Sequence, residues 1–330
     1  MKIAVVGATG LVGSVMLKVL AERKFPVSEL IAAASERSVG KMVEFAGRQI
    51  PVVSVADAVA AKPAVAIFSA GSSTSKQWAP RFAEVGTFVV DNSSCWRMNA
   101  DVPLVVPEVN PDAIEAKHHI ISNPNCSTIQ LMVALRPLQL KYGIKRIVIS
   151  TYQSVTGTGV KAVQQLLDER AGKPADMAYH HPIDLNCFPH GGDFLPSGYT
   201  TEEQKLIDET HKILGDNSIM VSPTVVRVPV MGGHSEAVNV ELCTSYELGD
   251  IVELLSRAPG ICVQDDPSRN IYPMPRMAQH RDEVFVGRLR RDPNLPNALN
   301  MWVVSDNLRK GAATNAVQIA ELLLQRGLIG

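Results

Sequence analysis

Residues 3–13 read IAVVGATGLVG, and they indicate how the chain begins to fold. A short apolar run is followed by glycines, and apolar side chains then recur at helical spacing up to Leu20. A strand, a glycine turn and a helix in this order let the backbone approach a pyrophosphate at the helix N-terminus. Gly7, Gly10 and Gly13 are spaced GxxGxxG rather than the commoner GxGxxG. The segment predicts nucleotide binding, with an ordinary strand–helix turn as the alternative.

The next strand, expected at residues 30–34, is followed by residues that distinguish two dinucleotides. At this place an acidic side chain binds the ribose 2′-hydroxyl of NAD, whereas an arginine accommodates the 2′-phosphate of NADP. Arg37 and Ser38 therefore favour NADP. Glu36 keeps NAD open as an alternative, in which Arg37 is merely solvated.

Further short apolar runs predict a parallel sheet in this part of the chain. They alternate with expected helices and lie at residues 64–69, 87–90, 104–106 and 120–121. Ligands of open α/β sheets bind at the carboxyl ends of the strands. Gly71, which follows one of these strands, is therefore a candidate for lining the cofactor pocket, although turn chemistry alone also explains a glycine there.

A cysteine stands where a later strand turns into a helix. Residues 122–130 read SNPNCSTIQ, and the helix is expected at residues 128–140. The free N–H groups and the dipole of a helix N-terminus stabilise an anion, so the pKa of Cys126 is expected below the usual value of about 8.5. Cys126 is therefore a candidate nucleophile, and the alternative is a small buried hydrophobic residue.

The pattern changes after this helix to longer strands in which apolar and polar residues alternate. Such strands are expected at residues 145–152, 220–230, 235–243, 283–289 and 299–304. They predict an antiparallel sheet with one buried face, and helices are expected at 160–170, 202–214 and 250–257. This part is an α+β domain, and the last helix, residues 311–324, is expected to pack back on the first domain.

The segment 172–200 is a long loop rich in Pro, Gly and His. Irregular loops longer than about 15 residues usually serve function or assembly. The histidines and the cysteine of this loop do not show the spacing of metal ligands, so no metal site is expected.

Further polar residues are of the kinds that thiol-based acyl transfer requires. His234 lies in a turn between two strands and can serve as acid and base, or it is structural. Arg227, in an apolar strand, needs an anionic partner, which is either a ligand or an internal carboxylate. Arg97 can hold a phosphate or be an ordinary surface residue. Glu202 and Lys205 lie one helical turn apart, as they also would at a solvated helix start.

Composition limits the class of protein. The 330 residues carry a net charge of −1, so a broad basic surface for nucleic acid is not expected, and a small molecule is the expected partner. Five widely spaced cysteines fit reduced thiols rather than a disulfide framework. No apolar run approaches the roughly 18 residues of a membrane span, and residue 1 leads directly into a strand. A soluble, cytoplasmic protein is expected.

Several motifs together resemble the aspartate-semialdehyde dehydrogenase family, in the same order and over nearly the whole chain. They are GATGLVG, SERSVGK, SSCWRM, DVPLVVPEVN, ISNPNCSTIQ, TYQSVTGTG, TEEQK, RVPVMGGHSE and SDNLRKGAA. The resemblance implies an α/β fold of the glyceraldehyde-3-phosphate dehydrogenase type. It has a Rossmann-like NADP-binding domain at residues 1–126 plus 308–330 and an inserted α+β catalytic and dimerisation domain at 127–307, in a homodimer.

The resemblance also implies an activity. In it, NADPH reduces aspartyl 4-phosphate to aspartate 4-semialdehyde and phosphate, through a cysteine thioester, in the biosynthesis of lysine (by way of diaminopimelate), threonine and methionine. By position, Cys126 is the nucleophile, His234 is the acid and base, and Gln153 helps to hold the substrate near the thiol.

The binding residues follow from the same resemblance. Arg227 takes the substrate carboxylate, and Glu202 attracts its amino group. Arg97 and Lys205 take the phosphate. The positions that match cofactor-binding residues are Thr9, Gly10, Leu11, Val12, Arg37, Ser38, Thr156, Gly157 and Asn307.

Two alternatives remain at this point. N-acetyl-glutamyl-phosphate reductase shares the architecture and the thioester chemistry, but its cysteine segment typically reads NPGCYPT, and residues 123–130 read NPNCSTIQ. A non-catalytic binding protein on the same scaffold is the second alternative. The presence of Cys126, Gln153, Arg227 and His234 disfavours it.

Overall fold

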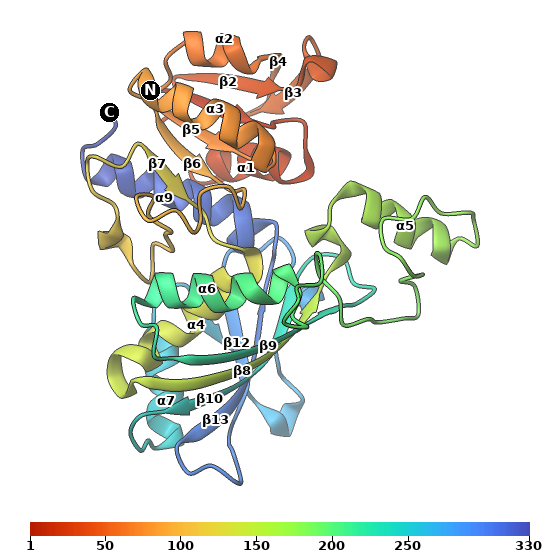
Figure 1. Cartoon of the computed structure of the whole chain (residues 1–330), viewed down its shortest axis with the longest axis vertical. Coiled ribbons are helices and arrows are strands. Elements are labelled where there is room, and N and C mark those ends of the chain that lie inside the picture. The colour runs from red at the N-terminus through yellow and green to blue at the C-terminus, as the bar shows by residue number, and fades with distance from the viewer. The chain divides into compact units, whose positions relative to one another are not determined.

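The computed structural model describes residues 1–330, which form two compact units (Figure 1). The first unit comprises Met1–Asn125 and Ala312–Gly330, and the second comprises Cys126–Gly311. The domain boundaries expected from the sequence lie after residues 126 and 307. Cys126 belongs to the second unit because it begins helix α4 (Cys126–Tyr142), which packs on the sheet of that unit. No helix of the chain has both the length and the apolar character that spanning a bilayer requires.

The first unit is built on a seven-stranded sheet of order β3-β4-β2-β1-β5-β6-β7. Its strands are β1 (Lys2–Val6), β2 (Glu29–Ala34), β3 (Met42–Phe45), β4 (Arg48–Ser54), β5 (Val65–Phe68), β6 (Phe88–Asp91) and β7 (Ile120–Ser122). All neighbours pair in parallel except β3 and β4, which form an antiparallel hairpin. The sequence prediction missed this hairpin. It was also wrong about residues 104–106, where only Leu104 forms an isolated bridge, to Ser122.

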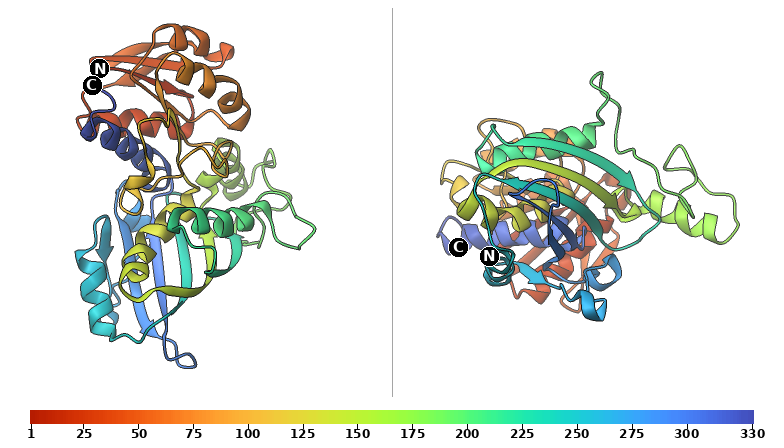
Figure 2. Two further views of the ribbon diagram at one scale, coloured as in Figure 1. Left: turned by 60° about the vertical axis from the view of Figure 1, so that its left-hand side comes forward. Right: turned by 90° about the horizontal axis from the view of Figure 1, so that it is seen from below.

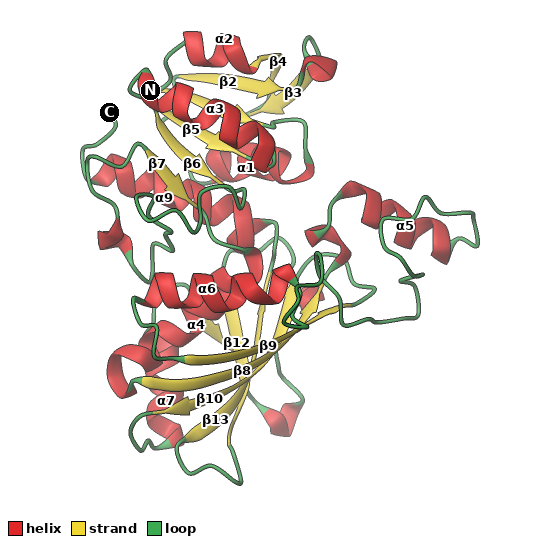
Figure 3. Ribbon diagram, in the orientation of Figure 1, coloured by secondary structure: helices red, strands yellow, loops and turns green.

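Helices cover both faces of this sheet (Figure 3). Successive side chains of a strand point to opposite faces, so Ile3 and Val5 pack with α1 (Leu11–Glu22) and α9 (Thr314–Gln325). Ala4 and Val6 instead pack with α2 (Val55–Ala60) and α3 (Ser72–Glu84). The predicted return of the C-terminal helix to the first unit is confirmed.

The second unit contains a six-stranded sheet of order β11-β12-β13-β10-β8-β9. Its strands are β8 (Ile144–Gln153), β9 (Met220–Arg227), β10 (His234–Leu242), β11 (Ile261–Val263), β12 (Val284–Arg291) and β13 (Ala298–Ser305). The prediction of an antiparallel sheet is only partly right, because β8 pairs with β9, and β11 with β12, in parallel. Between β8 and β9 the chain makes a long connection that includes helices, as a parallel pair requires.

Helices α4, α6 (Thr201–Leu214) and α7 (Leu248–Arg257) pack together on the sheet of the second unit. Helix α5 (Val160–Arg170) and the loop after it extend away from that sheet (Figure 2). Glu236 departs from the expected alternation, because it lies on the face that α4 covers and is fully buried. Burial raises the pKa of this carboxyl well above its usual range, so the neutral acid is the form that fits there.

Candidate active site

Cys126 and His234 meet in the second unit. Cys126 is the first residue of α4, which begins two residues before the helix expected at 128–140, and His234 is the first residue of β10 rather than part of the turn before it. Their Sγ and Nε2 atoms lie 3.2 Å apart. A side chain at position 311 would come within 3.0 Å of Cys126 Cβ, so Gly311 lets the backbone pack closely against the thiol. The pair combines a sulfur at a helix N-terminus with a nitrogen that can exchange a proton with it.

The two ring nitrogens of His234 have different partners. The backbone N–H of Ser154 donates to Nδ1 over 3.0 Å, so the proton of the neutral ring lies on Nε2, which faces the sulfur. Complete burial and the charge of Arg227 lower the pKa of His234 to about 3, against the opposing effects of Glu202 and of a backbone hydrogen bond with Gly233. The ring is therefore neutral near pH 7 and donates toward sulfur through Nε2.

Two loops hold the ring in this orientation. Asn307 Oδ1 accepts hydrogen bonds from Thr156 Oγ1 (3.0 Å) and from the backbone N–H of Gly233 (3.1 Å), which ties the loops together. A Cβ at Gly157 would lie 2.9 Å from Cε1 of His234. Thr156, Gly157 and Asn307, three of the residues predicted to bind cofactor, thus lie around the histidine. The sequence argument missed the part played by Ser154, although this residue lies inside the TYQSVTGTG motif.

Gln153 brings a further polar group to the second unit. It is fully buried at the end of β8, and its Nε2 donates to Ser127 Oγ over 2.8 Å. Its Oε1 atom is buried and has no hydrogen-bond partner. Because an unsatisfied buried acceptor is costly, this oxygen is well suited to receive a hydrogen bond from a ligand.

Arg227 ends β9, directly opposite Gln153 in the strand register. Its side chain is buried, and a Cβ at Gly157 would lie 3.4 Å from its Nη1 and 3.0 Å from Nε2 of His234. The structure contains no ion pair of Arg227, so the alternative of an internal salt bridge is not observed. A buried guanidinium with this placement is suited to bind a carboxylate through two hydrogen bonds.

Glu202 and Lys205 occupy the first turns of α6. Lys205 Nζ lies 2.9 Å from Glu202 Oε2, and the side chains are 34% and 12% exposed for Lys205 and Glu202 respectively. Because the Glu202 side chain is largely buried, the alternative that it is an ordinary solvated residue at a helix start is wrong. The two residues instead present a cation and an anion at one place, and the carboxylate contributes to the field around His234.

Arg97 belongs to the first unit and is buried there, so the alternative of an ordinary surface arginine is wrong. Its Nε donates to the carbonyl of Asn123 over 3.0 Å, and its Nη2 donates to the carbonyl of Asn92 over 2.9 Å. Both carbonyls follow strands, β7 and β6. The guanidinium is therefore held at the carboxyl edge of the first sheet, where ligands of such sheets bind.

A hollow of about 460 Å³ lies at the same edge of the first sheet. Residues that line it come from the ends of β1, β2 and β5 and include Gly7, Thr9, Gly10, Glu36 and Ala70. The two outer glycines of the motif are required: a Cβ at position 7 would lie 2.3 Å from Ser69 O, and one at position 13 would lie 2.1 Å from Gly7 O. The volume of the hollow falls within the range of small-molecule sites, and the glycines allow the close backbone approach that a pyrophosphate needs.

The other predicted cofactor residues are near this hollow in sequence. Arg37 is exposed and Ser38 is buried, and both directly follow the lining residue Glu36. Gly71 follows the lining residue Ala70 with a φ of +79°, which favours glycine. Leu11 and Val12 begin α1, and Val12 packs its side chain against the core.

Comparison with known proteins identifies the relatives of this chain. Residues 2–117 match the family model described as semialdehyde dehydrogenase, NAD binding domain, and residues 135–310 match semialdehyde dehydrogenase, dimerisation domain. An aspartate-semialdehyde dehydrogenase of Aquifex aeolicus is 53% identical over 99% of both chains.

Solved structures give the same result. Aspartate semialdehyde dehydrogenase II from Vibrio cholerae, complexed with ASA, is 46% identical, has a TM-score of 0.94 and covers 98% of each chain. The enzyme from Candida albicans, solved with NADP, is 26% identical with a TM-score of 0.79 over 99% of each chain. These likenesses favour the predicted family over both alternatives considered from the sequence.

Proposed function

Because the chain belongs to the aspartate-semialdehyde dehydrogenase family, we propose that it reduces aspartyl 4-phosphate to aspartate 4-semialdehyde and phosphate with NADPH. The observation that carries this proposal is the 3.2 Å contact between Cys126 Sγ and His234 Nε2 at the start of α4. The product serves the biosynthesis of lysine, threonine and methionine.

The first step is a transfer of the acyl group to sulfur. The Cys126 thiolate attacks the acyl carbon, the carbon–sulfur bond forms, and the bond to the phosphate oxygen breaks. Phosphate leaves with the electron pair and is held by Lys205 and Arg97. The His234 Nε2–H and the helix N-terminus keep the sulfur anionic before the attack.

The second step releases the aldehyde. NADPH, when bound, supplies the hydride that reduces the thioester. The oxygen that becomes negative requires N–H donors, which the first turn of α4 can provide. The negative oxygen then re-forms the carbonyl as the carbon–sulfur bond breaks, and the Nε2–H of His234 donates a hydrogen bond to the thiolate that leaves.

Substrate position depends on three residues of the second unit. Arg227 binds the α-carboxylate in a bidentate fashion, and Glu202 attracts the α-ammonium group. The unpartnered Gln153 Oε1 accepts a hydrogen bond from the substrate near the sulfur. These contacts hold the substrate by its other groups, so the acyl carbon is free to face Cys126.

The two units have separate tasks in this proposal. The first unit binds NADP through its glycine turn and through Arg37 and Ser38, and the second carries the thiol chemistry. The unit that holds the six-stranded sheet also mediates a homodimer, because its matching family model is a dimerisation domain. No two of the five cysteines form a disulfide, which supports a reducing compartment, the cytoplasm, as the place of action.

Substitution of the nucleophile tests the chemistry. We expect Cys126→Ala to lower phosphate-dependent reduction of NADP by aspartate 4-semialdehyde by roughly four orders of magnitude or more, because no thioester forms. Cys187→Ala, at an exposed cysteine, is the matched control and should be unaffected. Initial rates, with NADP binding measured by fluorescence, separate the chemistry from binding. Turnover near that of the wild type in Cys126→Ala would contradict the covalent route.

Cofactor preference is tested at Arg37. Removal of its charge should raise the KM for NADP about tenfold or more while leaving the KM for NAD nearly unchanged, because only NADP carries the 2′-phosphate. Arg48→Ala, at another exposed arginine of the first unit, serves as the control. An equal loss with both cofactors in Arg37→Ala would show that this arginine does not read the phosphate.

A further inference from the structure

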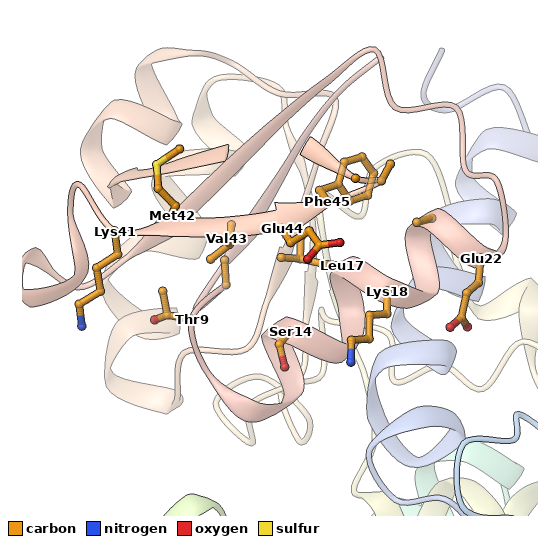
Figure 4. A pocket seen from close by; sticks show the side chains of 14 residues that line it. Thr9, Ser14, Leu17, Lys18, Glu22, Lys41, Met42, Val43, Glu44 and Phe45 are labelled. Atoms are coloured by element: carbon orange, nitrogen blue, oxygen red, sulfur yellow. The ribbon is translucent and has the colours of Figure 1, made fainter. Parts of the chain in front are cut away.

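A second hollow, of about 690 Å³, opens in the first unit between helix α1 and strand β3 (Figure 4). Ser14, Leu17, Lys18, Ala21 and Glu22 line it from α1, and this spacing corresponds to one face of a helix. Residues 41–47 line it from the opposite side. Its volume falls within the range of small-molecule sites, about 300 to 1,000 Å³.

The strand pairing explains why this space stays open. Strand β2 pairs with β4 only at Ala32–Ala34 opposite Val52–Ser54. The rest of the hairpin, with β3 at the edge of the sheet, extends beyond β2 and passes alongside α1. Val43 and Phe45 are half-buried and pack against the core that also contains Leu17. They leave an apolar floor in the hollow, and the two rims are polar.

The rims carry charges of both signs, two lysines and two glutamates. The ammonium groups of Lys18 and Lys41 point to one side of the pocket from its two ends, Lys41 at the end of Thr9 and Lys18 at the end of Ser14 (Figure 4). Both lysines are exposed, and neither forms an ion pair. The carboxylates of Glu22 and Glu44 also line the hollow. They select against a ligand whose body carries additional negative charge.

This hollow is separate from the predicted cofactor pocket. Only Thr9 lines both of them. The cofactor pocket is bordered by residues of α2 and α3, such as Val55 and Gln77, whereas the second hollow is bordered by α1. Since these helices cover opposite faces of the sheet, a ligand can occupy either place without filling the other.

We propose that the hollow between α1 and β3 is a second small-molecule site, which binds a monoanion with an apolar, ring-sized body. The anionic head lies on the side of Lys18 and Lys41, and the body rests on Leu17, Val43 and Phe45. The positive charge of the lysines favours a negatively charged group on the ligand, and the apolar floor favours an apolar body. Thr9 is the one lining residue that this site shares with the cofactor pocket, and none of Leu17, Lys18, Lys41, Val43 and Phe45 has a part in the proposed reaction.

The probe for this site is 8-anilinonaphthalene-1-sulfonate, an aromatic monoanion whose fluorescence increases in an apolar environment. The full chain is titrated with it in the absence of NADP and in saturating NADP, which keeps the cofactor pocket filled. Two variants address the site: Ala21→Phe fills the hollow without a change of charge, and the pair Lys18→Ala/Lys41→Ala removes the cations. The pair Lys62→Ala/Lys117→Ala, at exposed lysines elsewhere in the first unit, is the matched control.

The expected result is saturable fluorescence that persists in NADP, with affinity at least fivefold weaker in both site variants and unchanged in the control. Thermal unfolding of each variant verifies the fold, and the lysine pair, being exposed, keeps the test valid if Ala21→Phe does not fold. Loss of the signal in NADP would overturn the proposal, because the probe would then sit in the cofactor pocket. Equal affinities for the probe in Lys18→Ala/Lys41→Ala and in the control Lys62→Ala/Lys117→Ala would overturn the proposal as well.

Discussion

At the scale of single residues, His234 shows how its surroundings select one form of a side chain. A histidine near neutral pH is usually a mixture of charged and neutral rings. Burial and Arg227 remove the charged form, and the N–H of Ser154 selects the tautomer whose proton faces Cys126. Ser154 and Cys126 are distant in sequence from His234, so the motif around the histidine, which includes Arg227, predicts its chemistry but not its tautomer.

The low pKa of His234 has a consequence for stability. The folded ring titrates near pH 3 and the unfolded one near 6.5, so the unfolded state binds more protons between these values. This residue should therefore cost about 1.4 kcal/mol of unfolding free energy for each pH unit below about 6. Urea unfolding from pH 7 to pH 5 measures the slope, and His234→Gln should be less sensitive to pH. Parallel curves for the two proteins would refute the buried neutral ring.

Gly157 offers a second test at this scale. In Gly157→Ala the new Cβ would meet the His234 ring at 2.9 Å and must displace it from Cys126. We expect kcat to fall about tenfold or more, because small displacements of catalytic groups are costly. Gly249→Ala, where a Cβ meets open space, is the control. An unchanged kcat in Gly157→Ala would mean that the ring does not need its present position.

At the scale of elements, the start of α6 connects substrate binding to the sheet. Thr200 and Glu203 form a capping box, in which the Glu203 carboxylate accepts from the backbone N–H of Thr200 over 2.7 Å. The same carboxylate accepts from the N–H of Val225 in β9 over 3.0 Å. One buried side chain thus fixes α6, with Glu202 and Lys205, against the strand that ends in Arg227. The TEEQK motif marks a helix start but does not reveal this second attachment.

Removal of the Glu203 carboxylate should therefore lower the free energy of unfolding. Glu203→Ala leaves the N–H groups of Thr200 and Val225 without their acceptor, so we expect about 2 to 4 kcal/mol less unfolding free energy. Glu247→Ala is the comparison, because Glu247 stands at the N-cap of α7 without a side-chain capping bond and should change stability by less than about 0.5 kcal/mol. Urea denaturation measures both, and similar losses would contradict the structural role of Glu203.

At the scale of the whole molecule, the face of the second sheet opposite α4 carries only the short segment 273–278, which packs beside Trp302, and the rest of this face supports the proposed dimer. Helices α4, α6 and α7 pack together on one face. The other face presents half-buried residues, with the rings of Tyr152 and Trp302 at 5.4 Å from each other. Ala237 lies on that face between its register partners Ser150 and Trp302. Two copies of this chain can cover the face mutually, as a twofold dimer requires.

A charge on this face tests the assembly. Ala237→Arg should convert the dimer into monomers at micromolar concentration, because the interface would then bury an unpaired cation. Asn217→Arg, at an exposed position outside the sheet, should leave the dimer intact. Sedimentation velocity distinguishes the two states. A dimer of undiminished stability in Ala237→Arg would place the interface elsewhere.

Local patterns in the amino-acid sequence were enough for much of this protein. The glycine turn, the helix after Cys126 and the order of the motifs depend on neighbours a few residues apart, and they predicted an α/β unit, an α+β unit and the family. The β3–β4 hairpin, the mixed second sheet and burial of Arg97 depend on contacts between distant segments. The same holds for the tautomer of His234, the double role of Glu203 and the hollow beside α1, because packing and hydrogen bonding between such segments appear only once the chain has folded.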